Sequence, residues 1–187
     1  IVLVTSAMGK TTNLLEKLVH AFRAGEKGEI DALIAELSTF HHAILADLFT
    51  NSEHPVYSKV KDLIFSITER KKEQFSENFD YEYDQIVSLG EILSTTIVAS
   101  YLNEIQVKSK WLDARALVRT NHTYREAQVD WDKSQELIKR QVLASLEEHD
   151  IVITQGFIGH TIEGQTTTLG REGSDYSAGI LAYCLDA

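Results

Sequence analysis

Two wholly apolar runs of strand length constrain the fold of this chain more than any other feature. The first is Ile1-Val2-Leu3-Val4 at the start of the sequence, and the second is Ile151-Val152-Ile153. Their length and lack of polar alternation indicate buried strands. Long segments with apolar residues at helical spacing lie between them. Strands that alternate with long helices predict an α/β fold with helices on both faces of a sheet.

The apolar pattern also predicts where the other elements lie. Thr11 or Thr12 is expected to cap the first helix, and the third helix is expected to begin just after Pro55, the only proline. Glu163-Gly164 is expected at the tip of a β-hairpin. Strands are predicted at residues 1–6, 106–112, 116–120 and 151–155, and the hairpin at 158–168. Helices are predicted to cover residues 14–22, 30–48, 56–67, 81–102 and 134–149, with a last one from about residue 174.

The charge and composition exclude several classes of function. The 187 residues carry a formal net charge of −10, which argues against nucleic acid as a partner, since binding to phosphate backbones needs clustered Lys and Arg. No apolar run reaches the ~18 residues of a membrane span, so no membrane association is predicted. The single cysteine, Cys184, lies in an apolar helical pattern, and we expect it to be buried and unpaired. This use of cysteine fits a reducing cytoplasm.

The first apolar strand runs into a loop with some features of a phosphate site. Gly9-Lys10-Thr11 matches the end of a P-loop, but that pattern also requires a glycine at the position of Val4. A Walker A site is therefore rejected. The helix that follows still presents free backbone N–H groups, so the loop is compatible with anion binding or with an ordinary capped helix.

A second loop, residues 167–177, has the composition of an anion site at the start of a helix. Gly170 and Gly173 permit close approach of the backbone or a positive φ. Ser174 and Asp175 are expected to provide the N-cap and the first turn of the last helix. The alternative is a simple return from the hairpin into a capped helix.

Two charged residues stand where packing alone does not explain them. Arg171 lies between the two glycines and adds a forked cation that matches a carboxylate or a phosphate. Glu91 follows Gly90 inside a helix, where a glycine costs roughly 1 kcal/mol relative to alanine and indicates close packing or close approach of a ligand. Because Glu91 shares a partly apolar face with Val87, its carboxylate is either paired in a salt bridge or bound to a cation such as a ligand ammonium.

Other kinds of site find no support. The seven histidines lack the spacing of metal ligands, so no metal site is predicted. The sequence has no nucleophile elbow, so no Ser-His-Asp triad is assigned.

Five segments, taken together and in order, carry a resemblance to a known family. They are Val4-Thr5-Ser6-Ala7-Met8-Gly9 through Thr12-Asn13-Leu14-Leu15, Ser88-Leu89-Gly90-Glu91-Ile92-Leu93-Ser94, Leu112-Asp113-Ala114-Arg115, Val152-Ile153-Thr154-Gln155-Gly156-Phe157-Ile158-Gly159, and residues 166–178. They span nearly the whole chain and resemble the aspartokinases of the amino-acid kinase family. The resemblance implies a three-layer α/β/α sandwich around a mainly parallel central sheet, here truncated.

The resemblance also implies an activity, the transfer of the ATP γ-phosphate to the side-chain carboxylate of L-aspartate. The product, 4-phospho-L-aspartate, begins the synthesis of lysine, threonine and methionine. Mg²⁺ on the nucleotide phosphates, a cytoplasmic location and a homodimer of the full-length protein are implied as well. The residues that bind the nucleotide stay unassigned.

Carried over by position, the matching segments assign roles to individual residues. Arg171 would clamp a carboxylate of the aspartate, and Glu91 would hold its α-ammonium. Asp175 would be catalytic and orient the lysines that act on the phosphoryl group. The remaining residues of the implied aspartate pocket are Ser6, Thr12, Gln155, Gly156, Phe157 and Ser174.

Three departures from the family pattern matter. Glu172 stands where the family commonly has glycine, and is compatible only if it points away from the phosphates. The family's initial Lys-Phe-Gly-Gly-Thr-Ser strand is not in the sequence, nor are the rest of the nucleotide half and the C-terminal ACT domains. Residues 1–187 are therefore expected to be a partial catalytic domain, cut from a longer protein and without kinase activity alone. A kinase of another carboxylate or a carbamate, and a non-catalytic module of the same fold, remain alternatives.

Overall fold

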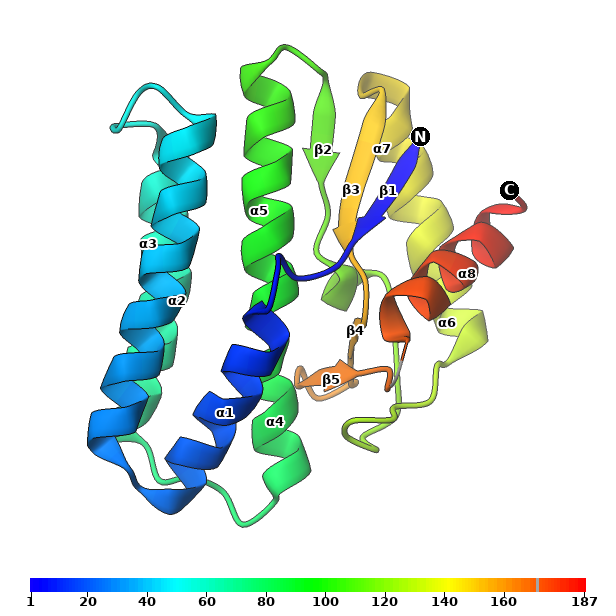
Figure 1. The fold of residues 1–187 in the computed structure, drawn as a ribbon. Coiled ribbons are helices and arrows are strands. Elements are labelled where there is room, and N and C mark those ends of the chain that lie inside the picture. Colours follow the sequence, from blue (N-terminus) through cyan, green and yellow to red (C-terminus); the bar gives the residue numbers. More distant parts are fainter. Residues whose placement is uncertain (171) are drawn as a thin grey trace.

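A computed structural model describes residues 1–170 and 172–187 of the chain. Helices and strands alternate as the apolar pattern predicts (Figure 1). The strands are β1 (Val2–Thr5), β2 (Ser109–Trp111), β3 (Ile151–Gln155), β4 (Ile158–His160) and β5 (Thr166–Thr168). The α-helices are α1 (Thr11–Ala24), α2 (Lys27–Leu48), α3 (Pro55–Glu69), α4 (Phe79–Val87), α5 (Leu89–Glu104), α6 (Trp131–Ile138), α7 (Ala144–Glu148) and α8 (Gly173–Leu185). Shorter helical turns are η1 (Arg70–Lys72), η2 (Ala114–Ala116) and the π-helical η3 (Lys139–Leu143).

The two apolar runs become neighbouring strands of a parallel sheet. Its order is β1-β3-β2, with Thr5 opposite Gln155 where β1 and β3 end. Helix α5 packs on one face of the sheet, and α7 and α8 pack on the other (Figure 1). The predicted three-layer α/β/α arrangement is confirmed. Since β1 and β3 are parallel, the loops that follow them leave the sheet at the same edge.

The paired helices α2 and α3 were predicted as helices but not placed by the sequence. They stand beyond α5, away from the sheet, so that α5 lies between them and the strands (Figure 1). Helix α1 packs against α2 and α4 and connects this helical part to the sheet through the loop after β1. Proline at the first position of α3 confirms the predicted start of that helix.

Several predicted boundaries are wrong, each for a local reason. Residues 116–120 do not form a strand, because η2 and the bends after it leave only isolated bridges at Arg119 and Thr120. Neither Thr11 nor Thr12 caps α1: Lys10 occupies the N-cap position, and the Thr11 hydroxyl donates to Met8 O at 2.7 Å.

The predicted helix at 134–149 begins three residues earlier and changes pitch in the middle. Asp130 caps α6, since its carboxylate accepts the N–H of Lys133 at 3.0 Å. The π-helical η3 then separates α6 from α7. The predicted helix at 81–102 is likewise divided at Ser88 into α4 and α5.

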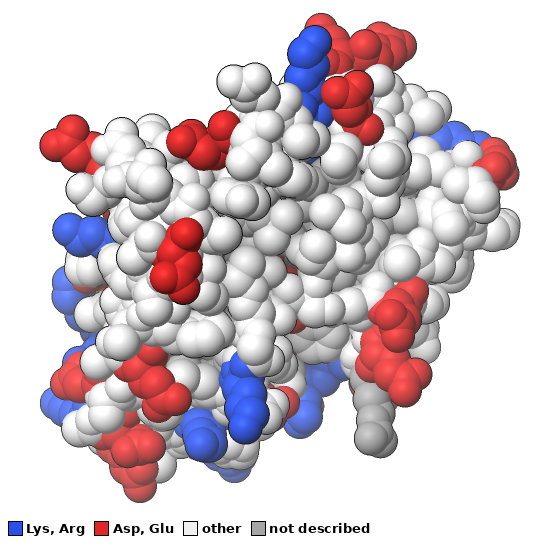
Figure 2. Space-filling model, turned by 45° about the horizontal axis from the view of Figure 1, so that its top comes forward, with Lys and Arg blue, Asp and Glu red and all other residues white. Residues whose placement is uncertain are grey.

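Acidic and basic side chains are interspersed on the face of the molecule shown in Figure 2. Figure 2 shows one face of the described part of the chain, on which Asp and Glu lie mainly around the edge and the centre is uncharged. Lys and Arg on this face stand among the acidic residues instead of forming a continuous basic stripe. Such a face lacks the clustered cations that a phosphate backbone needs.

Helices α4 and α5 together form a long, apolar helical stretch. By length and composition alone, Phe79–Glu104 is long and apolar enough to cross a membrane. The sequence does not single it out, because polar residues interrupt its apolar runs. However, 61% of its most apolar window is buried inside the protein. Packing against the sheet on one side and against α3 on the other accounts for that composition, as in the core helix of a folded domain.

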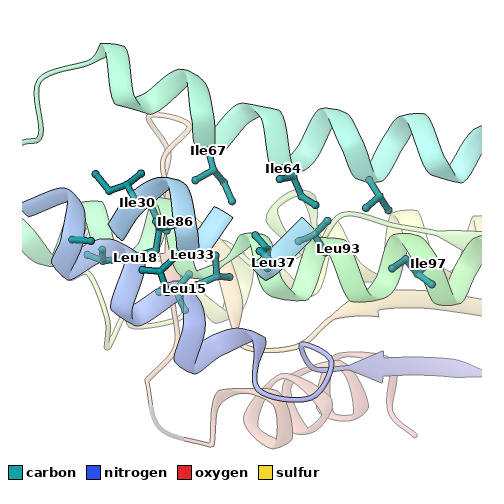
Figure 3. Close-up of a cluster of buried hydrophobic side chains, with 14 of the residues drawn as sticks. Leu15, Leu18, Ile30, Leu33, Leu37, Ile64, Ile67, Ile86, Leu93 and Ile97 are labelled. Carbon is teal, nitrogen blue, oxygen red and sulfur yellow. The ribbon is translucent and has the colours of Figure 1, made fainter. Parts of the chain in front are cut away.

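Hydrophobic cores hold the layers together. The largest lies among α1 to α5, where Ile64 of α3 points toward Leu37 and Leu93 (Figure 3). The second fills the space between the sheet and helices α6 to α8. Cys184 is fully buried there, which confirms the prediction of a small buried side chain.

Candidate functional site

A cavity of about 850 Å³ opens where the loops after β1 and β3 meet the start of α8. In open α/β sheets, ligands bind outside the carboxyl ends of the strands, which is where this cavity lies. Its wall includes parts of α1, α4, the β5–α8 loop and the loop at residues 123–126. The predicted site residues that line it are Ser6, Thr12, Glu91, Phe157, Ser174 and Asp175.

Two serines from opposite ends of the chain join at the cavity. The Ser6 hydroxyl, just after β1, donates to Ser174 Oγ in the first turn of α8 at 2.8 Å. Beside this pair, the N–H of Ala7 points to Glu91 Oε1 at 3.4 Å. The β1–α1 loop is therefore tied both to α8 and to α5 (Figure 1).

Glycines let the turn after β3 touch the start of α8. A Cβ added to Gly156 would lie 2.6 Å from Ser174 Oγ, and one added to Gly173 would lie 2.6 Å from Phe157 Cδ2. Phe157 itself has φ +70°, and its N–H donates to Ser177 Oγ at 2.9 Å. The predicted close approach at Gly173 is confirmed. It brings Phe157, Gly173 and Ser174 together at the cavity wall.

Glu91 is a buried carboxylate with one oxygen unused. The residue is 3% exposed, and Oε2 has no hydrogen-bond partner among the described residues. Burial raises the pKa of Glu91 to about 7, although the backbone N–H groups of Glu91 itself and of Ala7 act in the opposite direction. No salt bridge to Glu91 exists within residues 1–170 and 172–187, so the sequence alternative of a structural ion pair finds no partner there. A cationic ligand would satisfy the free oxygen.

Gly90 explains how α5 comes close enough to present Glu91. A Cβ at this position would lie 3.0 Å from Ala7 Cβ and 3.2 Å from Leu15 Cδ1. Of the two explanations that the sequence left open for this glycine, the structure shows close packing. The β1–α1 loop rests on the start of α5, which aims the next residue at the cavity.

Gln155 and Gly156 support the site from behind instead of lining the cavity. Gln155 is 1% exposed, its Oε1 accepts the N–H of Ala114 at 2.7 Å, and its Nε2 donates to Thr95 Oγ1 at 2.7 Å. Its side chain thus joins β3 to α5 and η2. Gly156 contacts Ser174 and donates its N–H to Thr5 O at 3.0 Å.

The start of α8 differs from the prediction by two residues. Glu172, not Ser174, occupies the N-cap position, with φ +59°, and Ser174 and Asp175 follow in the first turn. Helix α8 therefore begins at Gly173. A left-handed φ suits glycine best, but the residue that adopts it here is Glu172, and this residue also lines the cavity. Arg171, the predicted carboxylate clamp, lies outside the described residues.

Asp84 is a site residue that the sequence reasoning missed. It is fully buried and accepts hydrogen bonds from Thr168 N at 2.9 Å, Thr168 Oγ1 at 2.7 Å and Arg125 N at 3.0 Å. Burial raises its pKa to about 6, although these hydrogen bonds favour the ionised form. Asp84 precedes Glu91 by two helical turns in the sequence. Its position as a second acidic residue within the same apolar helical pattern is the signal that could have identified it.

The described residues contain no group of three or more His, Cys, Asp or Glu side chains that could hold a metal ion.

Comparison with known proteins agrees with this architecture. The model of the Amino acid kinase family matches residues 1–187. The chain is 37% identical to lysine-sensitive aspartokinase 3 of Escherichia coli (strain K12), over 98% of its own length and 40% of that protein. It is 29% identical to the aspartokinase of Chlamydia muridarum, over 98% of its length and 39% of that protein. Among solved structures, E. coli aspartokinase III in complex with aspartate and ADP matches all of this chain and 40% of that chain, with 36% identity and a TM-score of 0.89.

The chain thus spans about 40% of the length of these relatives. The likeness to the solved structure covers every layer described above, including the sheet and the helices that carry the cavity. From the family match along its full length and from its fold, the chain belongs to the amino acid kinase family.

Proposed function

We propose that the longer protein phosphorylates the side-chain carboxylate of L-aspartate with ATP, as the resemblance implies. The observation that carries this proposal is Glu91, a buried carboxylate with a free oxygen beside a cavity rich in hydroxyl groups. The names of the relatives support it, since they are aspartokinases, and one solved relative is described in complex with aspartate and ADP.

The cavity offers groups for each charged part of aspartate. We assign the α-ammonium to Glu91, because an ammonium neutralises a buried carboxylate and takes up its unused oxygen. The hydroxyls of Ser6, Thr12 and Ser174 would donate to a carboxylate, together with the start of α8, whose dipole favours an anion. Arg171 is proposed as the cation that clamps a substrate carboxylate.

Phosphoryl transfer mainly requires positioning and neutralisation of charge. The hydroxyl oxygens of Ser6 and Ser174, which lie 2.8 Å apart, would fix the carboxylate that accepts the phosphoryl group. Phe157 would line the site, Gly156 and Gln155 would support it from behind at the end of β3, and Asp175 would orient lysines that act on the phosphoryl group. When bound, Mg²⁺ would neutralise the phosphates of ATP, and no protein ligands for it are assigned.

Further expectations rest on the family resemblance alone. They are a homodimer of the longer protein, a cytoplasmic location, and a place at the start of lysine, threonine and methionine synthesis. The isolated residues 1–187 are expected to release no ADP in the presence of aspartate, because the chain spans only 40% of relatives that are named for the activity.

The test uses the longer protein and a coupled assay for ADP release. Aspartate should stimulate release, whereas carbamate and other amino-acid carboxylates should not. Glu91→Gln should raise the KM for aspartate at least ~10-fold, a loss of about 1.4 kcal/mol, while changing the KM for ATP little. Arg171→Ala should likewise raise the KM for aspartate far more than the KM for ATP. Glu104→Gln, at the other end of α5 and away from the cavity, is the matched control.

Two outcomes would contradict the assignment. If aspartate failed to stimulate ADP release and carbamate or another carboxylate succeeded, the protein would be a different kinase of the family. If calorimetry on the longer protein detected no binding of aspartate at all, the domain would be a non-catalytic module of the fold.

A further inference from the structure

Arg125 adopts a backbone conformation that costs energy at the edge of the cavity. Its φ is +68°, in the left-handed region that residues with a Cβ seldom occupy outside turns. Its side chain is 47% exposed and lines the cavity, in the loop that faces α4. A strained residue with a charged side chain at a cavity calls for a functional explanation.

Asp84 holds Arg125 in this conformation. The N–H of Arg125 donates to the buried carboxylate of Asp84, at 3.0 and 3.2 Å from its two oxygens. The same carboxylate accepts two hydrogen bonds from Thr168 in β5. Asp84 thus fixes the position of Arg125 relative to β5, the strand that leads toward the start of α8.

The guanidinium of Arg125 is oriented but mostly unused. Its Cζ lies 4.4 Å from the centre of the Tyr83 ring, and Nη1 lies 3.4 Å from Asp80 Oδ1. Tyr83 is itself fixed, because its hydroxyl donates to Glu16 Oε1 at 2.6 Å. A guanidinium has five N–H donors, and Asp80 is the one hydrogen-bond partner of this side chain within the described residues. Stacking on Tyr83 therefore leaves donors available to a ligand.

The charges around the cavity make this cation stand out. Arg125 is the one basic residue among the described residues of the cavity wall. The acidic residues of the wall are Glu16, Asp80, Glu91, Glu126, Glu172 and Asp175. An anionic ligand that passes these carboxylates meets repulsion unless a cation faces it.

We propose that Arg125 is a further substrate-binding residue, which holds an oxyanion of a ligand at the edge of the cavity. This inference rests on the proposed function, since both of its substrates carry oxyanions. The oxyanion is either a carboxylate of the amino acid or a phosphate of the nucleotide, and the fork of the guanidinium fits both. The role is separate from that of Arg171.

The test is Arg125→Gly in the longer protein, because glycine tolerates the left-handed backbone and removes only the side chain. The melting temperature should stay equal or rise, while the Kd for one of the two ligands, measured by calorimetry, increases at least ~10-fold. An increase for aspartate alone identifies the carboxylate, and an increase for ADP alone identifies the phosphate. The Kd of Arg125→Lys should lie between those of the wild type and Arg125→Gly, since lysine keeps the charge but lacks the forked donors of the guanidinium.

Two matched controls separate binding from backbone strain and from net charge. Gln106→Gly relieves a similar φ of +65° at an exposed position outside the cavity, and Arg23→Gln removes a cation that rests on Phe79. Both should leave the two Kd values within ~2-fold. Unchanged affinities for both ligands in Arg125→Gly, or an equal loss of both with a lowered melting temperature, would overturn the inference. Absence of aspartate binding and turnover in the wild-type protein would instead refute the proposed function.

Discussion

We expect Glu91→Gln to stabilise the unliganded protein at pH 8 while it weakens aspartate binding. The pKa of Glu91 is raised by burial from 4.5 to about 7, so between these values the folded protein holds a proton that the unfolded chain releases. The stability that this proton provides is fully present below pH 4.5 and is lost as the pH rises to 7. At about 1.4 kcal/mol per pH unit, the loss amounts to about 3 kcal/mol.

Urea unfolding of the wild type and of Glu91→Gln, measured from pH 4.5 to 8, tests this magnitude. The free energy of unfolding of the wild type should fall by about 3 kcal/mol more than that of the variant, because glutamine does not titrate. Asp84, whose pKa is also raised by burial, titrates in both proteins and cancels in the comparison. Glu104→Gln should follow the wild type.

The same proton should control ligand affinity. An α-ammonium binds the ionised form of Glu91, so the affinity for aspartate should rise with pH and level off above pH 7. At pH 6 about one molecule in ten is ionised, which predicts a Kd about 10-fold above its plateau. Parallel unfolding curves for wild type and variant, together with an affinity that does not depend on pH between 6 and 8, would refute the reasoning.

Two further perturbations follow from the packing of glycines, and two more from the hydrogen bonds of Gln155 and Asp84. Gly156→Ala should cost ~1–3 kcal/mol in the free energy of unfolding and weaken aspartate binding, because its Cβ would lie 2.6 Å from Ser174 Oγ. Gly28→Ala, where nothing lies within 4 Å, should stabilise α2 by about 0.5–1 kcal/mol; equal melting temperatures for the two would contradict the packing argument. Gln155→Leu should lower the melting temperature, since it leaves the buried N–H of Ala114 unpaired at a cost of ~1–3 kcal/mol; a melting temperature at or above that of the wild type would show that this hydrogen bond adds nothing. Asp84→Asn should speed the amide hydrogen exchange of the two N–H groups that Asp84 accepts, those of Thr168 in β5 and Arg125 in the 123–126 loop. Exchange rates equal to those of the wild type would show that Asp84 does not hold these two segments in position.

The layers of the fold could be predicted because the relevant signals are local. β1 and β3 are continuous apolar runs, and the long helices repeat apolar residues every three or four positions. The prediction of a strand at residues 116–120 was wrong because a residue distant in the sequence holds η2 in place. The N–H of Ala114 donates to Gln155 Oε1, 41 positions later in the chain. No pattern within the segment itself records that bond.

The candidate site divides in the same way. Loops that follow apolar strands, and a glycine that precedes an acid, are local patterns, and they indicate Glu91 and Ser174 directly, whereas Ser6 is assigned through the family resemblance. Asp84 and Arg125 escape such patterns because their roles depend on distant partners. The donors to Asp84 lie 41 and 84 positions away, and the conformation of Arg125 depends on one of those bonds.

The contact between the turn after β3 and the start of α8 has a consequence for how this enzyme family can diversify. Gly156 and Gly173 let these two segments pack against each other beside the cavity, so point mutations there add bulk and clash without offering new chemistry. Changes of ligand preference are therefore expected first in the part of the cavity wall where α4 and the 123–126 loop present exchangeable side chains. Engineering for altered substrates should leave the glycines untouched and begin with libraries at Asp80, Arg125 and Glu126.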